Sequence, residues 1–512
     1  MTKLGGVGSW QAKKIKRISL AIILAMMLAS CNQSNVDVFT DDETKSPDSY
    51  VNPDNEISSN SPDGTEGDDV GVGQGDEIDN PFVETSKNPV SYVYTSAETS
   101  SYKHFRDLVN SGYSLSELKK CSYSFKNEEF LNYFAHVDEF YGDFYSNIKM
   151  YPCAWNTDNY LFKFTLAAAK GEYSEKNNIV FYIDVSESMG GENMLAAVTG
   201  AARKFADSLS ENDVVSVVIS ASDGNIKLDS ANGSDKENIV SVIEGLYAQG
   251  SENNHDLLYT AYDVAKNNRI EDGQNTVIIV SDGDISDKYG SVISENANDG
   301  IKTSVIAVGS GNYKSEKLHE FARQGGGEYY YVDGKDEAES VLGEKIFYSR
   351  TPVADNLSVK VDFNEDVVEK YRLIGYEGML LSSDSSVEAV GNEASLYLGE
   401  NITLCYEITL SDAENVQNNF ADITVKYNSP SESEEIIKSF YADIDSIVED
   451  DGEMQTLSCA IETLMVLKSS SYGKNIKLSD VYNKLSEMDF EEYPKAEELY
   501  NLLGIITGKI KK

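Results

Sequence analysis

The sequence predicts a doubly wound, mostly parallel α/β domain that is inserted in or flanked by a β-sandwich, with a small helical region at the C-terminal end. Three observations predict this fold. Strand-like and helix-like runs alternate between residues 178 and 350, which is typical of a parallel sheet covered by helices. From about residue 453, apolar residues recur at helical spacing. Runs on both sides of the α/β segment read as strands, at 160–166, 357–363, 402–410 and 421–427.

The α/β segment can be read element by element. Residues 178–184 form an apolar run typical of a buried parallel strand. One amphipathic helix is expected next, at 195–209, because its apolar residues recur every three or four positions. Ligands of such sheets bind at the carboxyl ends of the strands. We predict further strands at 214–219, 276–280, 303–308 and 328–332, and helices at 236–247, 256–267, 315–324 and 336–348.

These patterns divide the chain into six parts. We expect the strands of both flanks to form one sandwich into which the α/β domain is inserted; a sandwich built from the C-terminal flank alone is the alternative. A pair of terminal helices is expected to pack on this sandwich. The predicted parts are a signal segment at 1–30, an acidic disordered tether at 31–88, a β-rich N-terminal flanking region with helices at 89–176, the α/β domain at 177–350, a β-rich domain at 351–450 and a helical region at 451–512.

The first thirty residues have the features of a secretory signal. Five basic residues and no acidic residue occur there, and an apolar run from Ile18 to Ala29 is too short to span a bilayer. The run ends in Leu28-Ala29-Ser30-Cys31, which resembles a bacterial lipobox. Cys31 would then carry a lipid that anchors the chain to the membrane surface. An ordinary signal peptide with a chance cysteine is the alternative.

The charge balance is strongly acidic, with 43 Lys and Arg against 86 Asp and Glu. This composition speaks against nucleic-acid binding through a basic surface, since such binding depends on cations that neutralise phosphates. Only four histidines are present, which leaves little room for a histidine-rich metal site. His255 is expected to be a surface or capping residue. The 32 tyrosines are expected to serve packing, with sugar stacking as the alternative.

Four cysteines follow Cys31, namely Cys121, Cys153, Cys405 and Cys459. They are widely spaced and form neither a CxxC pair nor a zinc pattern. An extracellular location would permit disulfides. Buried free thiols are the simpler expectation, and disulfides stay open as the alternative.

Polar residues collect where the predicted parallel strands end. Asp184, Ser186 and Ser188 form a D-x-S-x-S array after the first strand, and Asp282 follows the third buried strand of the sheet. Short oxygen ligands of this kind suit magnesium, manganese or calcium far better than zinc or copper. The alternative is that the serine hydroxyls only cap a helix.

This array resembles the metal-ion-dependent adhesion site of the von Willebrand factor type A (VWA) domain family. The resemblance implies that Asp184, Ser186, Ser188 and Asp282 bind a divalent cation, most simply Mg²⁺, with Mn²⁺ or Ca²⁺ also possible. A glutamate, Glu252, stands where the family usually has a threonine ligand. Such a glutamate could coordinate the metal itself, and it could also repel an acidic ligand.

The resemblance continues on both sides of the domain. Residues 94–102 and 128–134, and residues 371–377 after the domain, resemble a family of bacterial VWA-domain lipoproteins often labelled calcium-activated chloride channel homologues. No apolar segment of this chain could line a pore. No G-x-S-x-G, H-E-x-x-H or P-loop motif is present, so we expect no enzymatic activity.

The resemblance implies a protein that is lipid-anchored to the extracellular face of the cell membrane, in a bacterium of the Gram-positive type. Its VWA domain is expected to bind an unidentified protein ligand through the metal, as in adhesion. The alternative is an envelope assembly or scaffold factor in which the metal is structural. Glu252 favours the alternative, because a metal satisfied from within the chain has less to offer an external ligand.

Overall fold

The computed structural model describes most of the chain beyond the predicted tether. The predicted signal segment 1–30, Cys31, Glu252 and His255 lie outside the described part. The described residues are 79–137, 144–169, 176–191, 193–221, 225–249, 256–313, 315–347, 352–377, 395–411, 419–429 and 435–511.

The α/β domain contains one six-stranded sheet in the order β10-β9-β8-β5-β6-β7. The five strands from β10 to β6 in this order run parallel, and β7 is an antiparallel strand at one edge. The predicted doubly wound, mostly parallel sheet is therefore confirmed. The strands are β5 (Asn177–Ile183), β6 (Val214–Ile219), β7 (Ile226–Asn232), β8 (Gln274–Ser281), β9 (Lys302–Val308) and β10 (Gly326–Val332).

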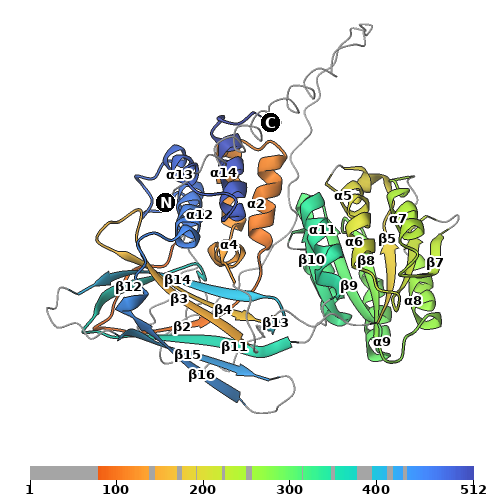
Figure 1. The fold of residues 1–512 in the computed structure, drawn as a ribbon, viewed down its shortest axis with the longest axis horizontal. Helices are drawn as coiled ribbons and strands as arrows, with labels where there is room; N and C mark the ends of the chain where they lie inside the picture. Colours follow the sequence, from red (N-terminus) through yellow and green to blue (C-terminus); the bar gives the residue numbers. More distant parts are fainter. Residues whose placement is uncertain are drawn as a thin grey trace, which may run out of the picture. The chain divides into compact units, whose positions relative to one another are not determined.

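Helices cover both faces of this sheet (Figure 1). Side chains alternate along the strands, so that Phe181 packs in one core and Tyr182 in the other. The Phe181 face packs against α5 (Leu195–Gly200), α6 (Ala202–Ser208), α7 (Lys236–Glu244) and α11 (Lys335–Gly343). The Tyr182 face packs against α8 (Leu257–Asn267), α9 (Gly290–Asn298) and α10 (Glu316–Gln324). The single helix predicted at 195–209 is two helices, because the chain leaves helical geometry at Ala201.

Two antiparallel sheets form the β-sandwich. The first has the order β1-β12-β14-β4-β3, and the second has the order β13-β11-β15-β16, with β2 also paired to β11. The strands of the first are β1 (Val83–Glu84), β3 (Phe144–Pro152), β4 (Tyr160–Ala168), β12 (Val368–Ile374) and β14 (Asn401–Leu410). Those of the second are β2 (Val90–Tyr94), β11 (Pro352–Phe363), β13 (Leu396–Tyr397), β15 (Asn419–Asn428) and β16 (Glu435–Asp443).

Both flanks of the α/β domain contribute to each sheet. In the first sheet, Phe164 of β4 lies opposite Leu404 of β14. In the second, Val93 of β2 lies opposite Val359 of β11. All four side chains belong to one buried core. The α/β domain is thus inserted between β4 and β11 of a shared sandwich, which confirms that prediction and excludes a sandwich from the C-terminal flank alone.

A layer of helices completes the flanking part (Figure 1). It combines α2 (Ser100–Asn110), α3 (Leu115–Cys121) and α4 (Asn127–Phe134) with α12 (Gly452–Lys468), α13 (Leu478–Leu485) and α14 (Pro494–Ile506). These helices share a core with Leu161, Ile374 and Cys405 of the first sheet. The predicted terminal pair is therefore three helices, and the N-terminal flank supplies three more.

Local chemistry explains where several of these helices begin. Ser114 and Glu117 form a reciprocal capping box at the start of α3. Asp451 caps α12 by accepting a hydrogen bond from the Met454 N–H (2.9 Å). Glu453, in the first turn of α12, pairs with the fully buried Lys163 of β4. This ion pair attaches the start of the helix to the sheet.

The structure modifies two other expectations. Strand pairing is present inside the segment assigned to the tether, since Val83 and Glu84 pair with β12. All four cysteines of the described part are free thiols. Three are buried as expected, whereas Cys121 is half-buried. Among the described residues, no helix has both the length and the apolar character that crossing a membrane requires.

Candidate functional site

The D-x-S-x-S array lies at the carboxyl edge of the parallel sheet. Ile183, the last residue of β5, lies opposite Val280 of β8, and the Asp184 N–H donates to the Val280 carbonyl (2.9 Å). Asp184 and Ser281 are therefore neighbours across strands spaced about 4.8 Å apart, and Asp282 is the next residue. The pairing brings both predicted carboxylates to one edge, as the sequence pattern indicated.

Asp184 is fully buried. Its Oδ1 accepts hydrogen bonds from the Ser186 N–H (2.9 Å) and from the Ser220 hydroxyl (3.3 Å). The Ser220 hydroxyl also accepts from the Val185 N–H (3.0 Å). These bonds fix the carboxylate relative to both the loop that follows β5 and the end of β6.

The two serines of the array lie together. The Oγ atoms of Ser186 and Ser188 are 3.0 Å apart, on the exposed side of the loop. Ser186 precedes the short 3₁₀ helix η2 (Glu187–Gly190), yet its side chain makes no capping hydrogen bond. The interpretation that these hydroxyls only cap a helix therefore has no support in the geometry of Ser186.

Asp282 is held through its backbone by Asn312, from the segment that follows β9. The Asn312 amide donates to the carbonyls of Asp282 and of Val308 (3.0 Å to the latter). Gly283 follows at φ +99°, and a Cβ there would lie 2.6 Å from Asn312 Oδ1. Only glycine fits this close approach without strain.

These residues fit a hard divalent cation. Two carboxylates and two hydroxyls supply oxygen ligands with room for water, which is the donor chemistry that Mg²⁺ and Ca²⁺ prefer. Within the described ranges, no group of three or more His, Cys, Asp or Glu side chains is placed to hold a metal ion, so a cation here would depend on the hydroxyls as well. Gln249 also lies near the array, because its N–H donates to the Val185 carbonyl (2.7 Å).

Two residues of this site were missed from the sequence. Ser220 directly follows the apolar run of β6, and the rule that selected Asp184 at the end of β5 would have found it. Asn312 lies in an irregular segment after β9, and no spacing or motif singles it out. Its role depends on a contact with Asp282, 30 residues away.

Helix α2 of the N-terminal flank meets the same edge of the α/β domain. Asp333 directly follows β10, and Arg106 of α2 binds it through two hydrogen bonds (Nε–Oδ2 2.6 Å, Nη2–Oδ1 2.7 Å). Arg106 also pairs with Glu498 of α14 (3.0 Å). Paired, fork-like contacts of this kind are the strongest that arginine makes with a carboxylate.

A second ion pair lies one helical turn away. Lys103 of α2 pairs with Glu337 of α11 (2.8 Å), and Lys345 pairs with the same carboxylate (2.9 Å). Burial alone would raise the pKa of Glu337, but the two ammonium groups hold this pKa well below its usual range. The carboxylate therefore stays ionised between two cations.

His104 and Asp107 of α2 also contact the VWA domain. The ring of His104 stacks on that of Tyr313, with centroids 3.7 Å apart and planes 2° from parallel. Asp107 accepts a hydrogen bond from the Tyr331 hydroxyl (3.2 Å) and interacts with Asn193, from the loop after the D-x-S-x-S array. Burial raises the pKa of Asp107.

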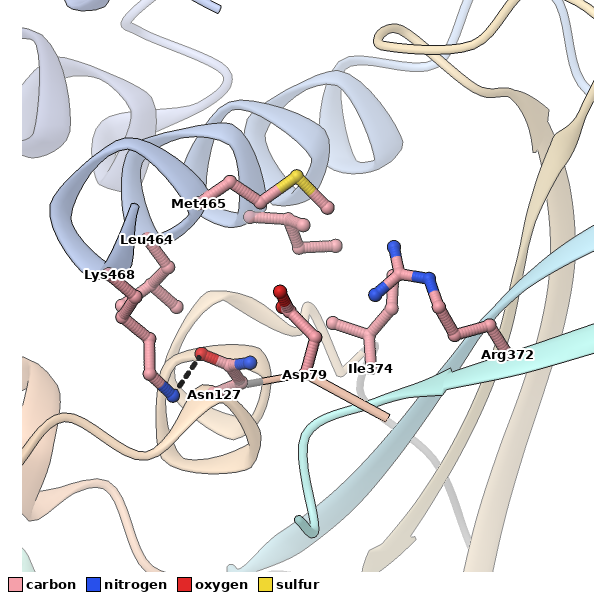
Figure 2. A pocket seen from close by; sticks show the side chains of 8 residues that line it. Asp79, Asn127, Arg372, Ile374, Leu464, Met465 and Lys468 are labelled. Atoms are coloured by element: carbon pink, nitrogen blue, oxygen red, sulfur yellow. Dashed lines mark hydrogen bonds between the residues drawn. The ribbon is translucent and has the colours of Figure 1, made fainter. Parts of the chain in front are cut away.

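A small cavity lies in the flanking part, between α12 and β12 (Figure 2). Its volume of about 10 Å³ admits a single water at most, so it is too small for an organic ligand. Arg372 lines it and pairs with Glu407 (2.6 Å). Lys468 donates to Asn127 at its far side (3.3 Å). The cavity is therefore a packing defect around a buried ion pair.

Comparison with known families defines the class of protein. Residues 178–344 match the von Willebrand factor type A domain. Residues 75–163 match a family described as von Willebrand factor, and residues 349–505 match one described as the C-terminal part of the uncharacterized protein YfbK. The chain therefore contains a VWA domain, and the segments on both sides of it are similar to these two further families.

One curated protein is also similar to this chain. The chain is 28% identical over 351 residues to the uncharacterized protein YfbK of Escherichia coli strain K12. The matched region is 65% of this chain and 60% of that protein. The chain thus spans about 60% of the length of this relative.

Several solved structures are also similar. A von Willebrand factor type A protein from Catenulispora acidiphila matches with 13% identity and a TM-score of 0.31, over 73% of this chain and 89% of that one. The ArnB paralog VWA2 from Sulfolobus acidocaldarius matches with 13% identity and a TM-score of 0.29, over 72% and 100%. With scores this low, neither structure carries an inference about function.

Proposed function

We propose that this protein is a non-enzymatic binding protein whose VWA domain holds a divalent cation and uses it to bind a protein ligand. The carrying observation is the arrangement of Asp184, Ser186 and Ser188 beside the Asp282 loop, at one edge of the sheet. VWA domains often bind protein ligands and divalent cations, and these donors are chemically suited to Mg²⁺.

The cation would be held by one buried and one half-buried carboxylate and by two hydroxyls that face outward. Ser220 would keep the Asp184 carboxylate in position through its hydrogen bond. Because Ser188 is exposed, a cation at this place would keep coordination positions open to water or to an oxygen of a partner. Such an open position is what a metal-bridged contact needs.

The proposal includes a location. Cys31 would carry the lipid that holds the protein on the extracellular face of the cell membrane. The support is the basic and apolar pattern of residues 3–30 and the small residues before Cys31. Mass spectrometry of the membrane fraction would detect the diacylglyceryl adduct on Cys31, and an unmodified Cys31 in an intact chain would refute it.

Metal binding can be tested by calorimetry and thermal unfolding. Magnesium should bind with one-to-one stoichiometry and raise the melting temperature, because a ligand at a hundred times its Kd stabilises the native state by about 2.7 kcal/mol. Asp184→Ala should abolish both effects. Asp299→Ala is the matched control, because Asp299 is exposed and follows α9 at the opposite edge of the sheet. No response of the unmodified protein to millimolar Mg²⁺, Mn²⁺ or Ca²⁺ would refute the site.

A second candidate is an envelope scaffold in which the metal is structural. The buried ion pairs between α2 and the VWA domain favour it, because they commit part of the metal edge to contacts within the chain. Capture from surface extracts separates the two candidates. Capture that is lost with chelator and with Asp184→Ala supports adhesion, whereas capture of envelope proteins that survives both supports the scaffold.

A further inference from the structure

The segment 309–313 touches both the metal-site loop and the flanking helix α2. Asn312 binds the backbone of Asp282. The next residue, Tyr313, stacks on His104 of α2. One short piece of chain thus contacts a predicted cation ligand and a helix that belongs to another part of the molecule.

Two further hydrogen bonds hold the backbone of Asn312. The Asn312 N–H donates to the Gly309 carbonyl (3.0 Å), which closes a tight turn. The Tyr329 hydroxyl, on β10, donates to the Asn312 carbonyl. Gly309 itself has φ +86°, a conformation that glycine adopts without strain. Asn312 and Tyr313 are joined by one peptide bond, so a displacement of Tyr313 acts directly on Asn312.

The contact of α2 with the VWA domain is ionic, and its inner pairs, Lys103–Glu337 and Arg106–Asp333, are largely buried. Removing one partner of a buried ion pair is strongly destabilising, because the other charge stays desolvated. Three cations face three anions, so the charges balance within the cluster. They are Lys103, Arg106 and Lys345 against Asp333, Glu337 and Glu498.

We propose that Asn312 is a positioning residue of the metal site and that the segment 309–313 couples cation binding to the docking of α2. When α2 is docked, the His104 stack holds Tyr313, and Asn312 holds the Asp282 loop in the geometry that a cation requires. When α2 separates, the Asp282 loop loses this support and the cation binds more weakly. By linkage, a bound cation favours the docked state by the same factor.

This inference rests on the proposed metal site and assigns it a further property. A partner that binds the flanking helices would change the cation affinity of the VWA domain. A partner that binds at the metal would strengthen the docking of α2 on the VWA domain. The flanks would then be part of the binding device rather than a passive support.

The test is calorimetric titration of Mg²⁺ into the full mature chain and its variants. His104→Ala and Asn312→Ala should each weaken binding roughly fivefold or more, a typical size for such coupling. His104→Phe should restore the affinity, because it keeps the ring stack. Arg203→Gln is the matched control, because Arg203 pairs with Glu237 on an exposed part of the same domain (2.6 Å). If His104→Ala lowers the melting temperature too far, Tyr313→Leu removes the same stack from the other side.

Hydrogen exchange provides the reciprocal measurement. Magnesium should slow amide exchange in residues 100–110 of the unmodified protein and should not do so in Asn312→Ala. Wild-type affinity in both His104→Ala and Asn312→Ala, with binding lost in Asp184→Ala, would overturn the coupling and leave the metal site intact. If the calorimetric titration with Mg²⁺ shows no heat of binding for either the unmodified protein or Asp184→Ala, the metal site and the coupling are overturned together.

Discussion

Replacement of Glu407 by Gln should destabilise the flanking part of the molecule strongly. Glu407 lies on β14, and its side chain is 1% exposed. It accepts hydrogen bonds from Arg372 (2.6 Å), from the Trp155 indole (2.9 Å) and from Asn159 (2.6 Å). The amide of Gln has the same size but no charge, so the Arg372 guanidinium would remain buried without its counterion.

The expected size follows from the burial of both partners. Removing one member of a buried ion pair costs about 3–5 kcal/mol, because the remaining charge stays desolvated. A protein of this size should have a urea m-value near or above 3 kcal/mol/M. The midpoint of urea unfolding should therefore fall by about 1–2 M.

The fluorescence of Trp155 allows unfolding to be followed in the part of the molecule that surrounds Glu407. The sequence contains two tryptophans, Trp10 and Trp155, and Trp10 lies in the predicted signal segment. With Trp10 replaced by Phe, or with that segment removed, intrinsic fluorescence reports on the indole that contacts Glu407. Lys426→Gln is the matched control, since Lys426 and Glu435 form an exposed pair (3.6 Å), and its effect should stay within about 0.5 kcal/mol.

A double-mutant cycle decides whether charge is the cause. In Arg372→Met/Glu407→Gln neither position of this ion pair carries a charge, and an apolar side chain can still pack on the Tyr472 ring, which lies 4.0 Å from the guanidinium. The double variant should be more stable than the sum of the single effects predicts. A midpoint for Glu407→Gln within about 0.3 M of the unmodified protein, or simple additivity of the two changes, would refute the reasoning.

Three further predictions concern the VWA domain and the thiols. Burial lowers the pKa of His319 from its ordinary 6.5, so the stability that it contributes is present above about pH 6.5 and is lost as the pH falls through the lower folded-state value. With four histidines in the chain, NMR of labelled rings should resolve this midpoint. Burial raises the pKa of Cys153 and of Cys459 to about 12, so both should react with thiol reagents roughly a thousandfold more slowly than in the unfolded chain, and later than the half-buried Cys121. Gly283→Ala should weaken Mg²⁺ binding roughly tenfold, because a Cβ at φ +99° would strike Asn312.

Each of these predictions has an outcome that would contradict it. A His319 midpoint at or above 6.5 would show that its ring is not desolvated as described. Rapid reaction of all four thiols in the native protein would show that the sandwich and helical cores open readily. For the metal loop, Gly399→Ala is the control, because Gly399 has φ +81° and open space around it; equal effects of the two alanines on Mg²⁺ binding would remove the role of the Gly283–Asn312 contact.

The inner part of the α/β domain was predictable because its strands are uniform. Every side chain of β5 is buried, and a continuous apolar run has few alternatives to a central parallel strand. The residue after such a run lies at the carboxyl edge of the sheet, which is why Asp184 and Asp282 could be placed together without coordinates. The assignment of the strand and the placement of the two carboxylates both depend only on local sequence.

Edge elements were harder to predict. Strand β7 carries Lys227 and Asp229 on its exposed side, so its pattern resembles a polar loop. The stripe from Leu195 to Leu209 is continuous in sequence, yet the helix breaks at Ala201, directly after Gly200, the last residue of α5. A single glycine inside a helical pattern lowers helix propensity without fixing an end, so the apolar stripe alone does not predict this break.

The contacts between α2 and the VWA domain could not be predicted from sequence. Arg106 and Asp333 are 227 residues apart, and Asp333 is one of 86 acidic residues. A charged residue gains its importance here from desolvation, and desolvation depends on the tertiary fold. The same holds for Asn312, whose neighbours in sequence give no indication that it reaches Asp282.

The inserted position of the VWA domain sets an order of assembly during synthesis. Thr165 of β4 and Thr403 of β14 are 238 residues apart, and their hydroxyls lie 3.1 Å from each other in the finished sheet. Ribosomes add roughly 5–20 residues per second, so β4 waits roughly 10–50 s for its partner. The strands of the VWA domain all emerge within this interval. The inner domain can therefore be complete while the outer sandwich still exposes the hydrogen-bonding edge and apolar face of β4, and this nascent stage is when the protein is most open to aggregation and most dependent on chaperones.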